Sequence, residues 1–341
     1  MKTAAVIPAV LTVLLTVSIA CGESASRPAP GPAEPTRDQR GDGGHAGSAP
    51  EHETRISVRQ AAVLGVVEGL TEYLPVSSTG HLILANHYMG LTEFSGERGP
   101  FGPTLRESEA VGAFDIVIQL GAILAVLGLY RRRVGQMAMG VVGRNRQGLR
   151  LFGLLVVAFL PAAVLGVLFR KPIKEHLFSP IPVAWALAVG GALMIAAELF
   201  WKRRWSGRER LSDVSRLRFW QALVIGLAQC LAMWPGTSRS MITIVAAVML
   251  GMELVAAAEF SFLLALPTLG GATVYEAAAS GPELIGAAGP LGLLVGLAVS
   301  CVVAGLAVKA LVAWLTRHGM WPFGLYRIGL AAAVWLYFLN A

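Results

Sequence analysis

Two carboxylates lie close together in an apolar stretch near residue 70. Glu68 and Glu72 are four residues apart, so they share one face if the stretch is helical. A carboxylate at membrane depth is unfavourable, and two on one face repel unless a cation or proton lies between them. Because hard divalent ions take oxygen ligands, the pair predicts a Mg²⁺ or Ca²⁺ site. The alternative is that one carboxylate only pairs with a structural arginine.

Hydroxyl groups and an imidazole follow the carboxylates directly. Pro75 ends the first helix, and the expected start of a second one carries Ser77, Ser78 and Thr79. A helix N-terminus presents free N–H groups that suit phosphate, although serine and threonine are also ordinary helix caps. His81 lies within one turn of Ser78, which fits a nucleophile with a general base. Alternatively, His81 itself attacks or donates a proton, or it is a hydrogen-bonded core residue.

A second polar cluster lies in a later apolar stretch, WPGTSRSMIT at residues 234–243. The forked donors of Arg239 match phosphate oxygens. The alternative is that Arg239 only neutralises Glu68 or Glu72, and the two roles are compatible. The hydroxyl residues predicted beside it are Ser238, Ser240 and Thr243.

The two clusters lie in similar segments, residues 62–84 and 222–244. Each has a helical half, a proline break, a Ser/Thr cluster and a second apolar half. Pro75 matches Pro235 only if one residue is skipped. Because each half is too short to span a bilayer, and broken helices at membrane depth must be buried or line a cavity, we predict two re-entrant helix hairpins that form the functional site.

Composition indicates a membrane protein. The 341 residues are 55% hydrophobic and 14% charged, whereas a soluble domain has about 25% charged residues. Apolar runs near the roughly 20 residues that cross a bilayer occur at 111–130, 151–169, 181–200, 254–273, 290–313 and 321–340. We predict an all-α polytopic membrane protein with inverted-topology repeats, about six spanning helices and two re-entrant hairpins.

Basic residues gather in short loops beside the apolar runs, notably Arg131–Arg133 and Lys202–Arg204. This pattern is typical of cytoplasmic loops and accounts for the net charge of +7 without nucleic acid binding. With both clusters inside, each repeat has three spans. Repeat one (56–205) and repeat two (215–341) are then inverted, and the first hairpin starts outside.

The N-terminal region is predicted to lie outside the membrane domain, which covers residues 56–341. Residues 1–21 indicate a signal peptide or a lipoprotein-like signal or anchor, because Lys2 precedes an apolar run that ends at Cys21. The sequence before Cys21 departs from a lipoprotein cleavage site at Ser18, so lipidation and an uncleaved anchor both stay open. Residues 22–55 are predicted to be a disordered extracytoplasmic linker.

Several other polar residues interrupt the apolar runs. They are Gln119, Glu198, Glu259, Tyr326 and Arg327. We predict helix–helix hydrogen bonding for them, with Glu198 or Glu259 paired with an arginine.

These motifs resemble those of the undecaprenyl-diphosphatase family, which is also known for bacitracin resistance. The resemblance rests on GVVEGLTEYLPVSSTGHL at 65–82 and WPGTSRSMIT at 234–243. It covers nearly everything after residue 56, and its supporting segments are residues 114–126, 161–166, 259–267 and 324–328.

The resemblance implies a bacterial plasma (inner) membrane enzyme that hydrolyses undecaprenyl diphosphate to undecaprenyl phosphate and inorganic phosphate, with a divalent cation. This reaction recycles the lipid carrier of cell-wall synthesis. Glu68 and Glu72 match the family's acidic pair. Ser78 and His81 match its hydroxyl and imidazole, and Arg239 matches its phosphate-binding arginine.

The expected partners are the polyprenyl diphosphate substrate and membrane lipids, a homodimer is left open, and the site is expected to face the extracytoplasmic side. Three alternatives remain. A different membrane lipid phosphatase would need a Lys/Arg-Pro motif followed downstream by His-x-x-x-Asp, and the sequence has no His-x-x-x-Asp. A polyprenyl-lipid transporter or flippase shares the inverted-repeat architecture, and the third alternative is a structural scaffold.

Overall fold

The structure is a computed structural model, and the residues that it describes begin at Arg55. The signal or anchor predicted for residues 1–21, and the linker predicted for residues 22–55 up to that point, lie outside the described residues. The described ranges are 55–99, 102–107, 109–177, 179–206 and 209–340.

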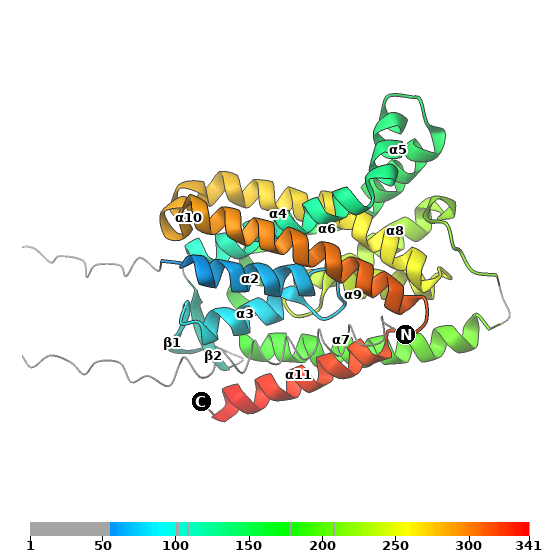
Figure 1. The fold of residues 1–341 in the computed structure, drawn as a ribbon. Coiled ribbons are helices and arrows are strands. Elements are labelled where there is room, and N and C mark those ends of the chain that lie inside the picture. Colours follow the sequence, from blue (N-terminus) through cyan, green and yellow to red (C-terminus); the bar gives the residue numbers. More distant parts are fainter. Residues whose placement is uncertain (1–54, 100–101, 108, 178, 207–208, 341) are drawn as a thin grey trace, which may run out of the picture.

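Long helices dominate the described chain and confirm the all-α polytopic membrane class (Figure 1). Five stretches are long and apolar enough to cross a membrane: Ala110–Leu129, Arg146–Phe169, Pro180–Arg204, Leu254–Ala278 and Leu284–Leu315. They belong to α4 (Glu109–Leu129), α6 (Arg146–Leu177), α7 (Pro180–Arg204) and α10 (Leu254–Leu315). Helix α11 (Trp321–Asn340), with 20 residues, corresponds to the sixth predicted span.

Helix α10 supplies two membrane-length stretches, because it turns back on itself at one end of the molecule (Figure 1). Its second stretch packs closely against α2 and α4, and glycines make the close approach possible. A Cβ added to Gly65 would lie 2.6 Å from the carbonyl oxygen of Gly296. A Cβ added to Gly121 would overlap the carbonyl oxygen of Leu297.

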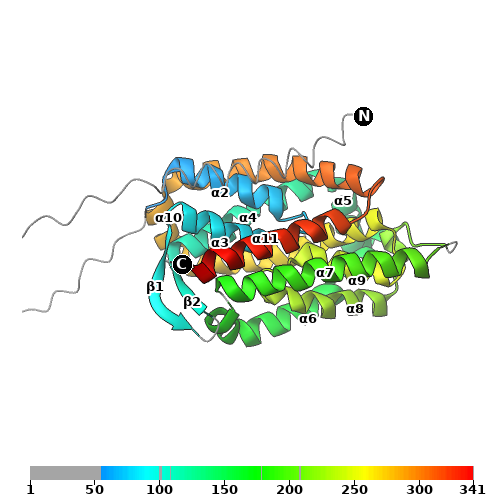
Figure 2. The same ribbon diagram turned by 90° about the horizontal axis from the view of Figure 1, so that it is seen from below.

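Two re-entrant hairpins enter this bundle from opposite ends (Figures 1 and 2). The first consists of α2 (Val58–Thr71) and α3 (Ser78–Tyr88). The second consists of α8 (Phe219–Gln229) and α9 (Arg239–Met249), joined by the short helix η2 (Cys230–Met233). Their opposite entry confirms the inverted arrangement, while the repeat boundaries at 205 and 215 stay predictions.

The hairpins share local details at one constant spacing along the chain. In the first, the side chain of Gln60 donates to the carbonyl of Met89 at 3.2 Å, which closes α2 onto the end of α3. In the second, Gln221 donates to the carbonyl of Leu250, also at 3.2 Å. The open ends of the two hairpins are therefore closed in the same way.

The same spacing pairs Pro75 with Gly236, so the correspondence needs no skipped residue. It also pairs Ser77 with Ser238. The two prolines, Pro75 and Pro235, consequently stand at adjacent and not equivalent positions of the repeat.

Two shorter elements come before the second hairpin in the chain, and the first of them lies at the basic end of the molecule, the end that carries Arg131–Arg133 (Figure 1). They are α5 (Arg131–Val141) and η1 (Val214–Arg216). Arg133 links them to α10, with an ion pair of 2.7 Å to Glu259 and a longer one of 3.7 Å to Asp213.

A small β-hairpin lies at the other end of the molecule (Figure 2). Strands β1 (Thr92–Gly99) and β2 (Gly102–Glu107) pair antiparallel between α3 and α4. This hairpin was not predicted from the sequence, because the segment is rich in Gly, Ser, Glu and Arg and poor in the β-branched residues that favour strands.

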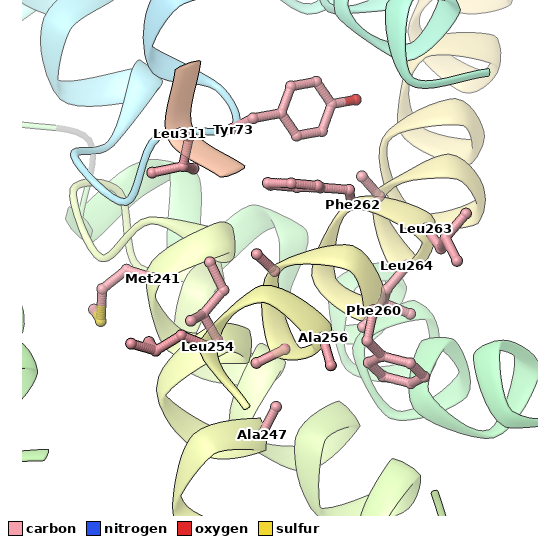
Figure 3. Close-up of a cluster of buried hydrophobic side chains, with 14 of the residues drawn as sticks. Tyr73, Met241, Ala247, Leu254, Ala256, Phe260, Phe262, Leu263, Leu264 and Leu311 are labelled. Carbon is pink, nitrogen blue, oxygen red and sulfur yellow. The ribbon is translucent and has the colours of Figure 1, made fainter. Parts of the chain in front are cut away.

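The main core packs around the residues that follow α2 and the first stretch of α10 (Figure 3). The ring of Tyr73 meets that of Phe262 edge-on, with centroids 5.3 Å apart. Tyr73 is fully buried, so the segment that carries the candidate site residues is held by the core itself.

Candidate active site

The tips of the two hairpins share an uncommon backbone conformation. Ser77 and Ser238 have φ angles of 77° and 71°, in the left-handed region that non-glycine residues rarely adopt. Each serine caps the helix that follows, accepting 3.3 Å hydrogen bonds from the backbone N–H of Gly80 and Met241 respectively. Such strained residues gather at functional sites, and here they present two helix N-termini to the same interior region.

One carboxylate links the tips. Glu72 directly follows α2, and its backbone N–H still donates to Glu68, which confirms that the two acids share a helical face. One Glu72 oxygen, Oε1, lies 2.9 Å from Nη2 of Arg239 on the second hairpin. The other, Oε2, accepts a hydrogen bond of 2.5 Å from the hydroxyl of Ser78. The side chains of Ser78, Glu72 and Arg239 are all buried.

Arg239 is fixed by further contacts. Its Nη1 donates to the backbone carbonyl of Ser261 at 2.8 Å, and its guanidinium carbon lies 5.5 Å from the centre of the Tyr73 ring. Thr243 supports the same arrangement, since its hydroxyl lies 2.7 Å from the hydroxyl of Ser261. Among the described residues, Nε of Arg239 has no hydrogen-bond partner, so one donor of the fork stays free for a ligand.

The imidazole of His81 is held on both sides. Its Nδ1 donates to the carbonyl of Ser77 at 2.7 Å, because a carbonyl can only accept. Its Nε2 lies 2.7 Å from the hydroxyl of Tyr326, and the two rings are nearly parallel. The hydroxyl of Ser78 is hydrogen bonded to Glu72 and not to His81, although their spacing had suggested a direct pair.

Glu68 is a second buried carboxylate in this region. Its side chain has no exposed surface, and neither carboxylate oxygen has a hydrogen-bond partner among the described residues. A buried carboxylate without a partner is costly, so Glu68 suits a cation. No group of three or more His, Cys, Asp or Glu residues that could hold a metal gathers within the described ranges, so Glu68 and Glu72 are the candidate acidic ligands there.

The other predicted hydroxyls differ in how far they join the cluster. Ser240 donates to the carbonyl of Leu74 at 3.0 Å, a bond between the hairpins, and Ser238 lies 3.0 Å from Ser240. Thr79 is half-buried at the first turn of α3, and its hydroxyl makes no hydrogen bond within the described part of the chain.

Three residues of the cluster lie on helices that the motif analysis did not connect with it. Ser261 was not singled out, and Tyr326 and Arg327 were predicted to make only helix–helix hydrogen bonds. Their signal was a polar residue in an apolar run, which does not reveal what the side chain faces. The predicted pairing of Glu259 with an arginine is confirmed by Arg133, whereas Glu198 pairs with a lysine, Lys202, at 2.7 Å.

The part of the chain that matches known proteins contains both hairpin tips. Residues 61–333 match the family described as bacitracin resistance protein BacA. Undecaprenyl-diphosphatase of Sorangium cellulosum (strain So ce56) is 51% identical over 81% of this chain and 85% of its own length. Undecaprenyl-diphosphatase 2 of Rhodospirillum rubrum is 44% identical over 82% of this chain and 94% of its own. For undecaprenyl-diphosphatase 1 of Paraburkholderia xenovorans the values are 42%, 81% and 94%.

Proposed function

Because the chain belongs to the bacitracin resistance protein BacA family, we propose that it hydrolyses undecaprenyl diphosphate to undecaprenyl phosphate and inorganic phosphate. This activity recycles the lipid carrier of peptidoglycan synthesis and underlies bacitracin resistance. The observation that carries the proposal is the buried link from Ser78 through Glu72 to Arg239, which joins a hydroxyl, a base and a phosphate-binding cation across the hairpins.

The substrate's diphosphate binds where the hairpin tips meet. The free Nε of Arg239 and the N-termini of α3 and α9 supply donors for phosphate oxygens. The hydroxyls of Ser77, Thr79, Ser238, Ser240 and Thr243 line or support this region. The polyprenyl tail stays in the lipid beside the apolar helices, where exposed side chains such as Leu160 and Val167 are plentiful.

Glu72 is the base in this proposal. The Ser78 hydroxyl already donates to it, so Ser78 Oγ attacks the terminal phosphorus while its proton passes to Glu72. The bond from that phosphorus to the bridging oxygen breaks, and undecaprenyl phosphate leaves. Water then cleaves the phosphoserine and releases inorganic phosphate. In the second route water attacks directly, and Ser78 only orients it.

His81 accepts at Nε2, the nitrogen that faces Tyr326, the proton of the water that cleaves the phosphoserine. Its Nδ1 is committed to the carbonyl of Ser77. The ring therefore has one nitrogen for anchoring and one for proton transfer.

The predicted Mg²⁺ or Ca²⁺ fits Glu68, whose buried oxygens lack partners, with Glu72 beside it. A divalent ion held there neutralises the carboxylates and stabilises negative charge on the phosphoryl group. Titration calorimetry of the purified protein with each metal tests this. Glu68→Gln should weaken binding, whereas Glu198→Gln, at a buried acid that pairs with Lys202 instead, should leave it unchanged. Equal binding by both variants would contradict the assignment.

We place the protein in the plasma (inner) membrane with its site open to the extracytoplasmic side. The first hairpin starts at the end of the molecule opposite Arg131–Arg133, and basic loops stay in the cytoplasm (Figure 1). Accessibility of single cysteines at the two ends to an impermeant thiol reagent, in a background without Cys21, Cys230 and Cys301, tests the orientation.

The reaction is tested with protein in liposomes and pure undecaprenyl diphosphate. Undecaprenyl phosphate and inorganic phosphate should appear in equal amounts. Lipid movement without phosphate release would instead support the transporter alternative. Crosslinking in the same liposomes decides whether the protein is a homodimer.

A further inference from the structure

Arg327 is a buried cation whose role the proposed reaction does not explain. It lies on α11, has no exposed surface, and forms no ion pair with a carboxylate among the described residues. Burying an arginine without a counter-charge is unfavourable unless its donors are satisfied. Its hydrogen-bond partners therefore indicate what the residue does.

Those partners are three backbone carbonyls from three different segments. Nη2 donates to Gly236 at 2.9 Å and to Ala186 of α7 at 3.0 Å. Nη1 lies 3.5 Å from the carbonyl of Pro75, at the limit of a hydrogen bond. Pro75 and Gly236 are equivalent positions of the two hairpins, so one guanidinium contacts both tips at matching carbonyls.

The space for the guanidinium is also built into the fold. Gly190 of α7 faces it, and a Cβ at that position would overlap Nη2 of Arg327. Two of the three contacted carbonyls, those of Pro75 and Gly236, lie two residues before the strained serines, Ser77 and Ser238 respectively. The contact therefore acts on the short loops that aim the start of α3 and α9.

We propose that Arg327 is a positioning residue for the phosphatase site: it clamps the two hairpin tips to each other and to α7. In this way it sets the separation of Ser78 and Glu72 on one tip from Arg239 on the other. The hydrogen bonds that Arg327 makes to the three carbonyls reach none of the side chains of Ser78, Glu72 and Arg239. The inference rests on the proposed function, but its first test does not need activity.

The first test is hydrogen exchange of the protein in detergent, followed by mass spectrometry. Arg327→Lys keeps the charge but loses the planar fork, so a single nitrogen replaces the two that reach the three carbonyls. Exchange should rise by roughly tenfold at both tips, including the capped amides of Gly80 and Met241. Arg133→Lys is the matched control, because it makes the same change at the basic end and should leave both tips protected.

A second pair of variants displaces the guanidinium without substituting Arg327 itself. Gly190→Ala pushes the guanidinium aside and should reproduce the exchange at both tips. Gly329→Ala, on α11, meets nothing within 4 Å and serves as its control. Exchange that rises at one tip only, or at neither, would overturn the proposal.

Activity gives the second readout. In monodisperse, folded protein, Arg327→Lys and Gly190→Ala should lower kcat by roughly 100-fold, as expected when catalytic groups are displaced by about 1 Å. The two control variants should keep wild-type kcat. If the wild type releases phosphate and Arg327→Lys matches it, only the clamp is wrong. If the wild type is inactive, the proposed function fails. If neither variant folds, Arg327 serves folding and the proposal is overturned.

Discussion

Arg239 of the second hairpin lies 2.9 Å from Glu72 of the first, and both side chains are buried. Neither hairpin alone brings this cation and this acid together. The Ser78 hydroxyl donates to the other oxygen of the same carboxylate, so the ion pair also fixes the candidate nucleophile. Removing one partner should therefore affect stability and activity in separable ways.

Glu72→Ala should lower the stability by about 3–5 kcal/mol, because it leaves the Arg239 charge buried and unpaired. Glu72→Ala with Arg239→Met should recover part of this loss, since the unpaired charge is gone, but it should not recover phosphate release. Thermal unfolding in detergent measures the first effect. A double variant less stable than either single variant would contradict the account.

Ser78→Ala should reduce phosphate release by roughly 10³-fold or more if the hydroxyl is the nucleophile. Ser77→Ala changes the neighbouring cap instead and should lower stability by about 1 kcal/mol. Mass spectrometry of protein quenched during turnover distinguishes the two routes. A phosphorylated Ser78 supports covalent attack, and its absence under conditions where turnover is fast supports direct attack by water.

Tyr326→Phe should lower kcat by about tenfold or more, because it removes only the hydroxyl that faces Nε2 of His81. The substitution should have no further effect when His81→Ala is already present, since the residue acts through the imidazole. Nitrogen NMR of histidine-labelled protein should show a changed Nε2 shift for His81. Tyr88→Phe, on the same helix as His81, is the control. An additive loss in the double variant would count against this role.

Gly121→Ala should lower stability by about 1–3 kcal/mol, because the added Cβ overlaps the carbonyl of Leu297. Gly128→Ala, on the same helix α4, meets nothing within 4 Å. It should be neutral or stabilise by up to about 1 kcal/mol through helix propensity. Thermal unfolding of the two variants compares them directly, and equal values would show that α4 and α10 do not pack this closely.

Much of the architecture could be predicted from local sequence. The breaks at Pro75 and Pro235, within apolar stretches too short to span, predicted both hairpins. The spacing of Glu68 and Glu72 predicted a shared helical face. These features depend on residues close together in the chain, where helical periodicity is informative.

Contacts between distant helices could not be predicted in the same way. The sequence shows Tyr326 and Arg327 as polar residues in an apolar run, and nothing local reveals that they face His81 and the hairpin tips. For the same reason the hydrogen-bond partner of Ser78 was not predicted, since its nearest candidate partner in sequence was His81. Its actual partner, Glu72, lies across the turn at the first tip.

The most direct test of the shared site compares one variant from each hairpin in phosphate release from undecaprenyl diphosphate. Glu72→Gln and Arg239→Ala are measured as folded protein in the same liposomes, with Arg133→Lys as control. The account predicts that both lose at least about 100-fold in kcat while the control stays active. Wild-type turnover by either hairpin variant would contradict a site formed by both hairpins.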